Sequence, residues 1–176
     1  EMCIRDSRWV RQTVENKTHL FYAIYDLDAN MFGGVASYLR IKPEAGSIEI
    51  GHINFAPQLQ RSRAATEALY LMMRWAFSAG YRRLEWKCDA CNSASRRAAQ
   101  RLGLSFEGIF RQASVVKGRN RDTAWFAAID AEWSALDQAF SVWLSPRNFA
   151  PDQTQKERLS DLTRLVRASG DPSLPR

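Results

Sequence analysis

The sequence predicts a mixed α/β (α+β) domain, with a twisted, mostly antiparallel sheet flanked by helices. Two observations lead to this fold class. Strand-like segments follow one another through short links near the start of the chain, and again in a hairpin near residue 118. Such links join antiparallel neighbours. A strongly amphipathic segment separates two further strand-like segments, which predicts that those two strands lie parallel through a right-handed crossover.

Three strands and one long helix are expected in the first half of the chain. The strand segments are rich in aromatic and β-branched residues. The turns between them are supplied by Asp28, Asn30, Gly33 and Gly34, and by residues 43–46. The helix has apolar residues at i, i+3, i+4, i+7, i+8 and i+11 from Ala65, and Gly80 is placed to end it. We expect a partial helix over 8–17, strands at 19–26, 35–42 and 47–55, and a helix at 64–79.

The second half continues with a strand, a helix, a hairpin and a further helix. Asn92 is placed to start the first of these helices and Gly103 to end it, and residues 117–120 form the turn of the hairpin. Beyond Pro146 the composition becomes polar, so we expect a surface tail with loose final residues. The expected elements are strands at 83–89, 104–116 and 122–129, and helices at 92–102, 132–143 and 154–168.

Composition limits the class of protein. The 45% share of apolar residues and six tryptophans in 176 residues indicate one globular domain rather than a disordered chain. The net charge of +6 suits an anionic ligand, and a solvated basic face without a partner is the alternative. No apolar run reaches about 18 residues, so no membrane span is expected. Sparse cysteine usage is typical of a cytoplasmic protein.

Three segments are distinguished along the chain. Residues 1–7, EMCIRDS, resemble translated read-through of a sequencing-library adapter, so we expect them to be non-native and exclude them from fold reasoning. Residues 8–143 are expected to form the domain. Residues 144–176 are expected to form the polar tail, with a short helix inside it.

The cysteines do not predict a metal centre. Cys88 and Cys91 are spaced C-x-x-C, but a tetrahedral zinc site needs a second pair of ligands. Only two histidines, His19 and His52, are present in the chain. We therefore expect two reduced thiols at a strand end and no bound metal.

The stretch from Ser47 to Ala68 carries the strongest functional signal. An isoleucine-rich strand ends before Pro57, the basic turn Gln58–Arg63 follows, and a helix begins directly after it. The first backbone N–H groups of a helix have no internal partners, so such a turn can bind an anion. The sequence therefore predicts a phosphate-bearing ligand here.

Three motifs in order resemble the GCN5-related N-acetyltransferase (GNAT) superfamily. Its phosphate loop, Gln/Arg-x-x-Gly-x-Gly/Ala, matches Gln60 to Ala65, with Arg63 in place of the central glycine. Asn92-x-x-Ser95 and Arg101-Leu102-Gly103 match later motifs. The resemblance covers about residues 19–131 and is greatest to ribosomal-protein N-terminal acetyltransferases. It implies the GNAT fold, here without its N-terminal strand and first helix.

The resemblance implies that acetyl-CoA donates an acetyl group to a primary amine by direct attack in a ternary complex. The two parallel strands are expected to separate near Phe55 and Asp89, so that the pantetheine arm pairs with the exposed strand edge. Four arginines are either phosphate contacts or exposed charges: Arg61, Arg63, Arg96 and Arg97. The cofactor-binding residues implied are Ile53, Asn54, Phe55, Gln60, Arg61, Ser62, Arg63, Ala64, Ala65, Asn92 and Ser95. A backbone N–H near Ile53 or Asn54 would hold the oxyanion.

Three residues are candidates for the chemistry. Glu49 lies 11 residues before Gln60, the spacing at which several members of the superfamily place a general base. Its strand face is expected to be apolar enough to raise a carboxyl pKa. His52, expected on the opposite face, is the rival base. Ser95 is the candidate acid, because Ala99 stands where many members have a tyrosine.

Each candidate has a structural alternative. For Glu49 the alternative is an ion pair with an arginine at a strand edge. For His52 it is a purely structural role. For Asn92 and Ser95 it is helix capping at the Ncap and N3 positions, which is compatible with cofactor contact by Asn92.

Two other function classes remain open. A non-catalytic acyl-CoA-binding or regulatory module is suggested by Arg63 and Ala99, which depart from the superfamily pattern. A nucleic-acid-binding domain is suggested by the basic charge and the tryptophans, but the basic residues are scattered and no stacking motif is present. The expected partners are acetyl-CoA and an amine acceptor, with no nucleic acid and no membrane, for a monomer or homodimer.

Overall fold

The computed structural model describes residues 9–15, 18–152 and 154–174 of the chain. The segment 1–7, predicted to be non-native, lies outside these residues. Of the partial helix predicted over 8–17, residues 9–14 are described as helical, and residues 8, 16 and 17 lie outside the described part.

The described residues form one six-stranded sheet with the strand order β1-β2-β3-β4-β6-β5. Four neighbouring pairs are antiparallel, and only β3 and β4 are parallel, joined through a helix as expected. The predicted fold class is therefore confirmed. The strands are β1 (His19–Asp26), β2 (Met31–Lys42), β3 (Ser47–Phe55), β4 (Arg83–Asp89), β5 (Ser105–Val116) and β6 (Arg119–Ile129).

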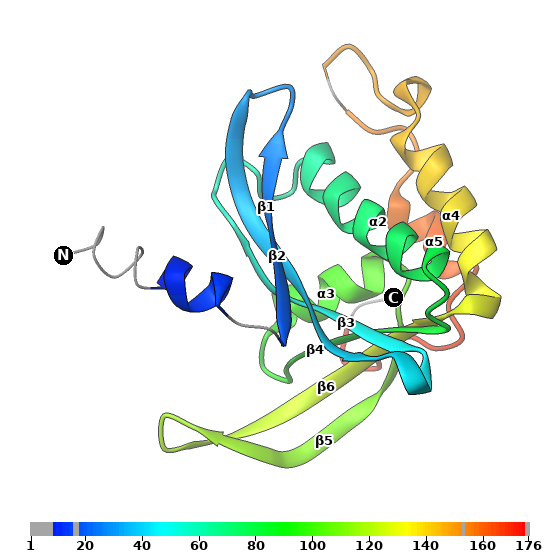
Figure 1. Ribbon diagram of the computed structural model, residues 1–176. Coiled ribbons are helices and arrows are strands. Elements are labelled where there is room, and N and C mark those ends of the chain that lie inside the picture. The colour runs from blue at the N-terminus through cyan, green and yellow to red at the C-terminus, as the bar shows by residue number, and fades with distance from the viewer. Residues whose placement is uncertain (1–8, 16–17, 153, 175–176) are drawn as a thin grey trace.

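The helices pack against one face of this sheet, as Figure 1 shows. Their apolar sides meet alternate residues of the central strands in the main core, so the opposite face of the sheet carries no helix from α2 to α5. The helices are α2 (Arg63–Ser78), α3 (Ser93–Arg101), α4 (Asp130–Leu144) and α5 (Leu159–Arg164), with 3-10 turns η1 (Pro43–Ala45) and η2 (Pro146–Asn148). The core includes Ile48, Ile50, Leu69, Met73, Leu84, Trp86, Phe126 and Phe140.

Asp28 and Asn30 lie in the first turn as predicted, but Gly33 and Gly34 do not, because both glycines lie within β2. The chain reverses earlier, at residues 27–30. The glycines are needed for close packing instead. A Cβ atom on Gly34 would lie 2.7 Å from the backbone oxygen of Asn54, and one on Gly33 would lie 3.0 Å from Cβ of Leu59. Leu59 belongs to the turn between β3 and α2, so the two glycines let this turn pack against β2.

The C-terminal residues that are described, up to residue 174, are packed against the domain rather than loose as predicted. The backbone N–H of Ala168 donates to Oγ of Ser105, and the N–H of Phe106 donates to the carbonyl of Ser169. β5 is an edge strand with unpaired backbone groups, and the last residues of the chain satisfy some of them. The predicted helix is shorter than 154–168, and its first residue, Leu159, is fully buried in the main core.

Candidate active site

The two parallel strands separate much earlier than predicted. β3 and β4 pair only through Ser47–Arg83, Ile48–Leu84 and Glu49–Glu85, so the predicted separation near Phe55 and Asp89 is wrong. The reason is a β-bulge in β3. His52 has a left-handed backbone (φ 49°), and the register between β2 and β3 shifts at this point. The remainder of β3 therefore presents an unpaired edge where β4 would have continued.

Ile53 directs its backbone N–H toward this unpaired edge. Val35 of β2 lies opposite Asn54, and the N–H of Ala56 donates to the carbonyl of Gly33 at 2.8 Å. In an antiparallel pair alternate residues bond to the partner strand, so Asn54 bonds to β2 and Ile53 faces away from it. Of the two oxyanion donors predicted from the sequence, the geometry favours Ile53.

The start of α2 leaves backbone donors available beside the separated strands. Ser62 is the N-cap, and its Oγ accepts a hydrogen bond from the N–H of Ala65 at 3.0 Å. Within the described part of the chain, the N–H groups of Arg63 and Ala64 have no hydrogen-bond partner. Arg61 precedes the cap with a left-handed backbone (φ 60°) and an exposed side chain. The predicted phosphate loop is thus a helix N-terminus with two free donors.

The side chain of Arg63 does not point to the loop that it belongs to. Its Nη2 donates to the carbonyl of Leu144 at the end of α4, at 2.7 Å, and its guanidinium lies 5.1 Å from the ring centroid of Phe149. The sequence hypothesis that this arginine supplies charge to a phosphate is therefore not supported by its position. Only its backbone N–H remains directed to the predicted phosphate site.

The second helix start, that of α3, is capped as the structural alternative predicted. Asn92 is the N-cap, and its Oδ1 accepts from the N–H of Ser95 at 3.0 Å. The hydroxyl of Ser95 accepts a hydrogen bond from Nε1 of Trp86 at 3.0 Å. Burial raises the pKa of the nearby Cys88 thiol, and a hydrogen bond with Ser95 opposes that rise. Ser95 therefore faces β4, at the edge where β4 has left β3.

Arg96 is also engaged within the protein. Its guanidinium binds both carboxylate oxygens of Asp171, each at 2.7 Å, and the carbonyl of Ala90 at 2.7 Å. The prediction that Arg96 contacts a phosphate is thus not supported by the geometry. Arg97, next along α3, and Arg61 are exposed and remain candidates for that contact.

Glu49 lies in charged surroundings rather than in the apolar ones predicted. Glu49 is buried, with 2% of its surface exposed. Its Oε1 lies 2.7 Å from Nη1 of Arg40, and its Oε2 lies 2.8 Å from Nζ of Lys87. The arginine pair is the structural alternative predicted for this glutamate. The apolar environment failed as a prediction because charged side chains of the two neighbouring strands converge on β3.

Lys87 extends this network across the sheet face opposite the helices, here called the outer face. Its Nζ is 2.6 Å from Oε2 of Glu85 and 3.9 Å from the ring centroid of Trp125, which pairs with it on β6. Burial alone would raise the pKa of Glu85, but hydrogen bonds from Arg83 and Lys87 outweigh it and hold that pKa below its ordinary value. The outer face therefore carries a row of alternating charges beside the strand separation.

His52 lies on the same face as Glu49, so its predicted opposite placement is wrong. Ser37 pairs with Gly51, two residues from Glu49, and cross-strand partners share a face. His52 contacts Ser37 through Nδ1 at 2.9 Å and Phe21 at 5.2 Å between ring centroids. The bulge at His52 inserts an extra residue, which reverses the alternation of side chains along β3.

The hydrogen bonds of His52 leave one ring nitrogen basic. The Ser37 hydroxyl donates to the carbonyl of Gly51, so it accepts from Nδ1 of His52, and Nε2 keeps its lone pair in the neutral ring. Desolvation and the adjacent His19 lower the pKa of His52 below its ordinary value. His52 is therefore neutral at pH 7, and the structure brings both candidate bases to the outer face.

Sequence reasoning missed Arg40, Lys87 and Trp125. The alternation Arg83-Leu-Glu85-Trp-Lys87 along β4 was a signal for one charged and one apolar face. Arg40 gave no comparable signal. Its contact with Glu49 depends on its own left-handed backbone (φ 46°) and on a shift of the β2–β3 register between Leu39 and Lys42.

The remaining predicted features concern metals and membranes. Within the described residues, no group of three or more possible metal-ligating side chains occurs. No helix in that part of the chain is long and apolar enough to span a membrane.

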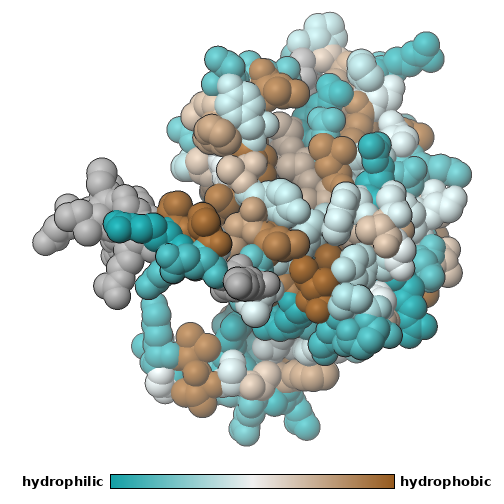
Figure 2. All heavy atoms as spheres, viewed as in Figure 1, coloured by the Kyte–Doolittle hydropathy of each residue, from teal (hydrophilic) through white to brown (hydrophobic). Residues whose placement is uncertain are grey.

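Cys88 is buried and Cys91 exposed, both as free thiols. Figure 2 shows the apolar residues of one face in separate groups among hydrophilic ones.

Comparisons with known proteins agree on one family. A family model described as acetyltransferase (GNAT) domain matches residues 3–105. The chain is 46% identical to a GCN5-related N-acetyltransferase from Brucella melitensis, over 90% of this chain and 72% of that one, with a TM-score of 0.87. It is 47% identical to a probable acetyltransferase (GNAT family) from Chromobacterium violaceum, over 73% of this chain and 65% of that one, with a TM-score of 0.69.

A more distant solved structure supports the same likeness. It is a putative acetyltransferase from T. thermophilus, 26% identical, covering 77% of this chain and 72% of that one, with a TM-score of 0.70. A search of curated proteins found no match.

Proposed function

Because the chain belongs to the GNAT acetyltransferase family, whose members transfer an acyl group from acetyl-CoA, we propose that it acetylates a primary amine. The amine attacks the thioester directly, within a ternary complex. The observation that carries this proposal is the separation of β3 and β4 after Glu49, with two helix N-termini beside it. The unpaired edge of β3 suits the amide groups of pantetheine, and a helix N-terminus suits pyrophosphate.

The cofactor-binding roles follow from these positions. Ile53 and Phe55 supply the strand edge, and the N–H groups of Arg63 and Ala64 bind the pyrophosphate. Gln60 supports this edge, since its Nε2 donates to the carbonyl of Phe55 at 2.9 Å. Arg63 replaces the glycine of the superfamily, but its side chain contacts Leu144 and Phe149 and so leaves the backbone N–H groups accessible to the pyrophosphate.

The chemistry requires a neutral amine, a stabilised oxyanion and a proton for the departing thiolate. We assign the base to Glu49, the oxyanion contact to the N–H of Ile53 and the proton donor to Ser95. The hydroxyl of Ser95 accepts from Nε1 of Trp86 and shares its own hydrogen bond with the Cys88 sulfur, so it must turn from Cys88 to the departing thiolate in order to donate its proton. His52 is the rival base, because it shares the outer face and keeps a basic nitrogen.

The acceptor is proposed to be a protein N-terminus or a small-molecule amine bound on the outer face. The resemblance to ribosomal-protein N-terminal acetyltransferases supports the first of these. A cytoplasmic location is proposed on the sparse cysteines of the chain.

The experiment that tests the function is thiol release from acetyl-CoA over a panel of amines, including peptides with free N-termini. Release that depends on the amine is the expected result. Binding of acetyl-CoA without thiol release over the whole panel would instead favour a non-catalytic acyl-CoA-binding module. Salt-dependent RNA binding without acetyl-CoA binding would favour the nucleic-acid alternative.

The proposed phosphate contact has a direct test in Arg63→Pro. Proline is accepted at the first position of a helix, and Ser62 before it is already extended (φ −78°, ψ 164°). The variant loses one N–H that is proposed to bind phosphate, so affinity for coenzyme A is expected to fall about tenfold, as for one hydrogen bond to a charged group. Calorimetric titration measures this loss.

Arg63→Ala is the matched control. It also loses the contacts with Leu144 and Phe149, but it keeps the backbone N–H. If both variants bind coenzyme A equally, the N–H of residue 63 does not contact the phosphate.

A further inference from the structure

Both of the helices that flank the strand separation are held by the last residue of α4 and by residues that follow it. Arg63 at the start of α2 binds Leu144 and Phe149, and Arg96 of α3 binds Asp171. Resting on the proposed function, we propose that Asp171 is a positioning residue for acetyl-CoA binding. It acts through Arg96, which holds the loop between β4 and α3.

The Arg96–Asp171 pair is a buried, two-bond contact. The carboxylate of Asp171 is fully buried at the side chain, and the arginine side chain is 12% exposed. Nε and Nη2 each bind one carboxylate oxygen at 2.7 Å, the geometry in which arginine and carboxylate bind most specifically. The third nitrogen, Nη1, is then directed to the carbonyl of Ala90 at 2.7 Å.

Asp171 is itself fixed on its own side. Its backbone N–H donates to Oε1 of Gln100 on α3 at 2.7 Å, and its Oδ1 accepts from the N–H and hydroxyl of Ser173. Burial alone would raise the pKa of Asp171, but hydrogen bonds from Arg96 and Ser173 outweigh it and keep that pKa below its ordinary value. The carboxylate therefore stays ionised and holds the guanidinium in one orientation.

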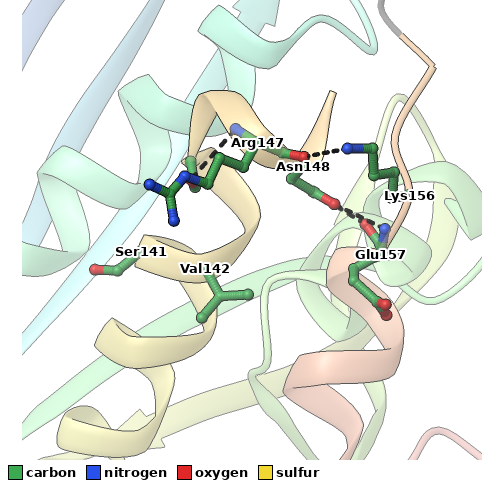
Figure 3. A pocket seen from close by; sticks show the side chains of 7 residues that line it. Ser141, Val142, Arg147, Asn148, Lys156 and Glu157 are labelled. Carbon is green, nitrogen blue, oxygen red and sulfur yellow. Dashed lines mark hydrogen bonds between the residues drawn. The ribbon is translucent and has the colours of Figure 1, made fainter. Parts of the chain in front are cut away.

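The chain between α4 and Asp171 is anchored at several points. Asn148 is buried, donates to the carbonyl of Trp143 and accepts from the N–H of Glu157, and Lys156 donates to the carbonyl of Arg147. Figure 3 shows the contacts of Asn148 with Glu157 and of Lys156 with Arg147, beside a surface depression of about 500 Å³. Farther along, Thr163 donates to the carbonyl of Arg101 at the end of α3. Asp171 is thus presented by a well-anchored segment.

The hydrogen bond from Arg96 to the carbonyl of Ala90 affects the predicted cofactor contacts on α3. Ala90 lies two residues before Asn92, the cap of α3, and Ser95 lies three residues after Asn92. Loss of the contact from Arg96 frees the loop that sets the position of this helix start. Asn92 and Ser95, both predicted cofactor contacts, lie on this helix start, so its displacement misplaces them relative to acetyl-CoA.

Asp171→Asn is the test, measured by steady-state kinetics and by calorimetric titration with coenzyme A. We expect the KM for acetyl-CoA and the Kd for coenzyme A to rise about tenfold, and kcat to fall as well, because Ser95, the proposed proton donor, lies on the same helix start. Asp161→Asn is the matched control, because Asp161 lies exposed in the same C-terminal part of the chain. It is expected to leave both constants unchanged.

Arg96→Lys separates positioning from folding. Lysine keeps the positive charge beside Asp171 but cannot bind the carboxylate and Ala90 together. An equal rise in KM with an unchanged unfolding midpoint supports the proposal. A fall in kcat or in stability without a change in KM or Kd, in either variant, overturns it. The titration with coenzyme A does not require turnover. If the wild type binds coenzyme A but releases no thiol with any amine, the proposed activity is contradicted. The comparison of Kd between the wild type and Asp171→Asn still tests the role of Asp171.

Discussion

Glu49→Gln is expected to lower kcat by about 10²-fold or more at neutral pH, the usual contribution of a general base. The KM for acetyl-CoA should stay within about twofold, because Glu49 lies on β3 before the proposed cofactor edge begins at Ile53. Glutamine keeps the shape of the side chain and removes its capacity to take a proton. Thiol release under saturating acetyl-CoA measures the effect.

Glu85→Gln is the matched control for the loss of charge. Glu85 binds the same lysine, Lys87, on the same face of the sheet, but no role in proton transfer is proposed for it. It is expected to keep kcat within about threefold, since only its partly buried ion pairs with Arg83 and Lys87 are changed. Equal losses in the two variants would show that the charge row, rather than the base, is responsible.

His52→Asn decides between the two candidate bases. The pKa of His52 lies below its ordinary value, so the ring is already neutral at pH 7 and loses its basic form only as the pH falls. If Glu49 is the base, His52→Asn leaves kcat near that of the wild type. A large loss of kcat in His52→Asn, together with an unchanged Glu49→Gln, would assign the base to His52.

Gly103→Ala is expected to lower the free energy of unfolding by about 3 kcal/mol, from left-handed strain together with overpacking. Gly103 ends α3 with φ 92°. A Cβ atom there would lie 2.4 Å from Cδ2 of Leu136 in α4 and 3.1 Å from Cβ of Thr163 in α5. Urea unfolding measures the change.

Gly80→Ala is the comparison that isolates packing. Gly80 ends α2 with nearly the same backbone, φ 90°, but a Cβ atom there would meet nothing within 4 Å. Only the left-handed strain remains, so a loss of about 1 kcal/mol is expected. Equal losses at the two glycines would show that α3, α4 and α5 do not pack as closely as described.

Most of the fold was predictable because local patterns agreed with one another. The apolar stripe of α2 meets the core at Leu69 and Met73, and the two glycines predicted to end helices do so with left-handed backbones. The alternating strands gave the meander and the terminal hairpin. The start of β2 was misjudged, because Gly33 and Gly34 are typical of turns but are used here for close packing.

The candidate site was predictable only in part. The capping of α3 by Asn92 was predicted from local chemistry and is confirmed, whereas the cap of α2, Ser62, was not predicted. The partners of Arg63 and Arg96 lie 81 and 75 residues away along the chain, so no local pattern indicates them. Their side chains therefore looked available for a phosphate.

The sequence by itself determined the order of the elements, the family, and the helix start that is proposed to bind pyrophosphate. The tertiary structure alone decided where β3 and β4 separate, and it did so through left-handed residues such as His52 that shift the register. It also brought Arg40 and Lys87 into ion pairs with Glu49. Periodicity along one strand predicts which face a side chain takes, but a bulge reverses that face, and the energy of a bulge depends on the neighbouring strand.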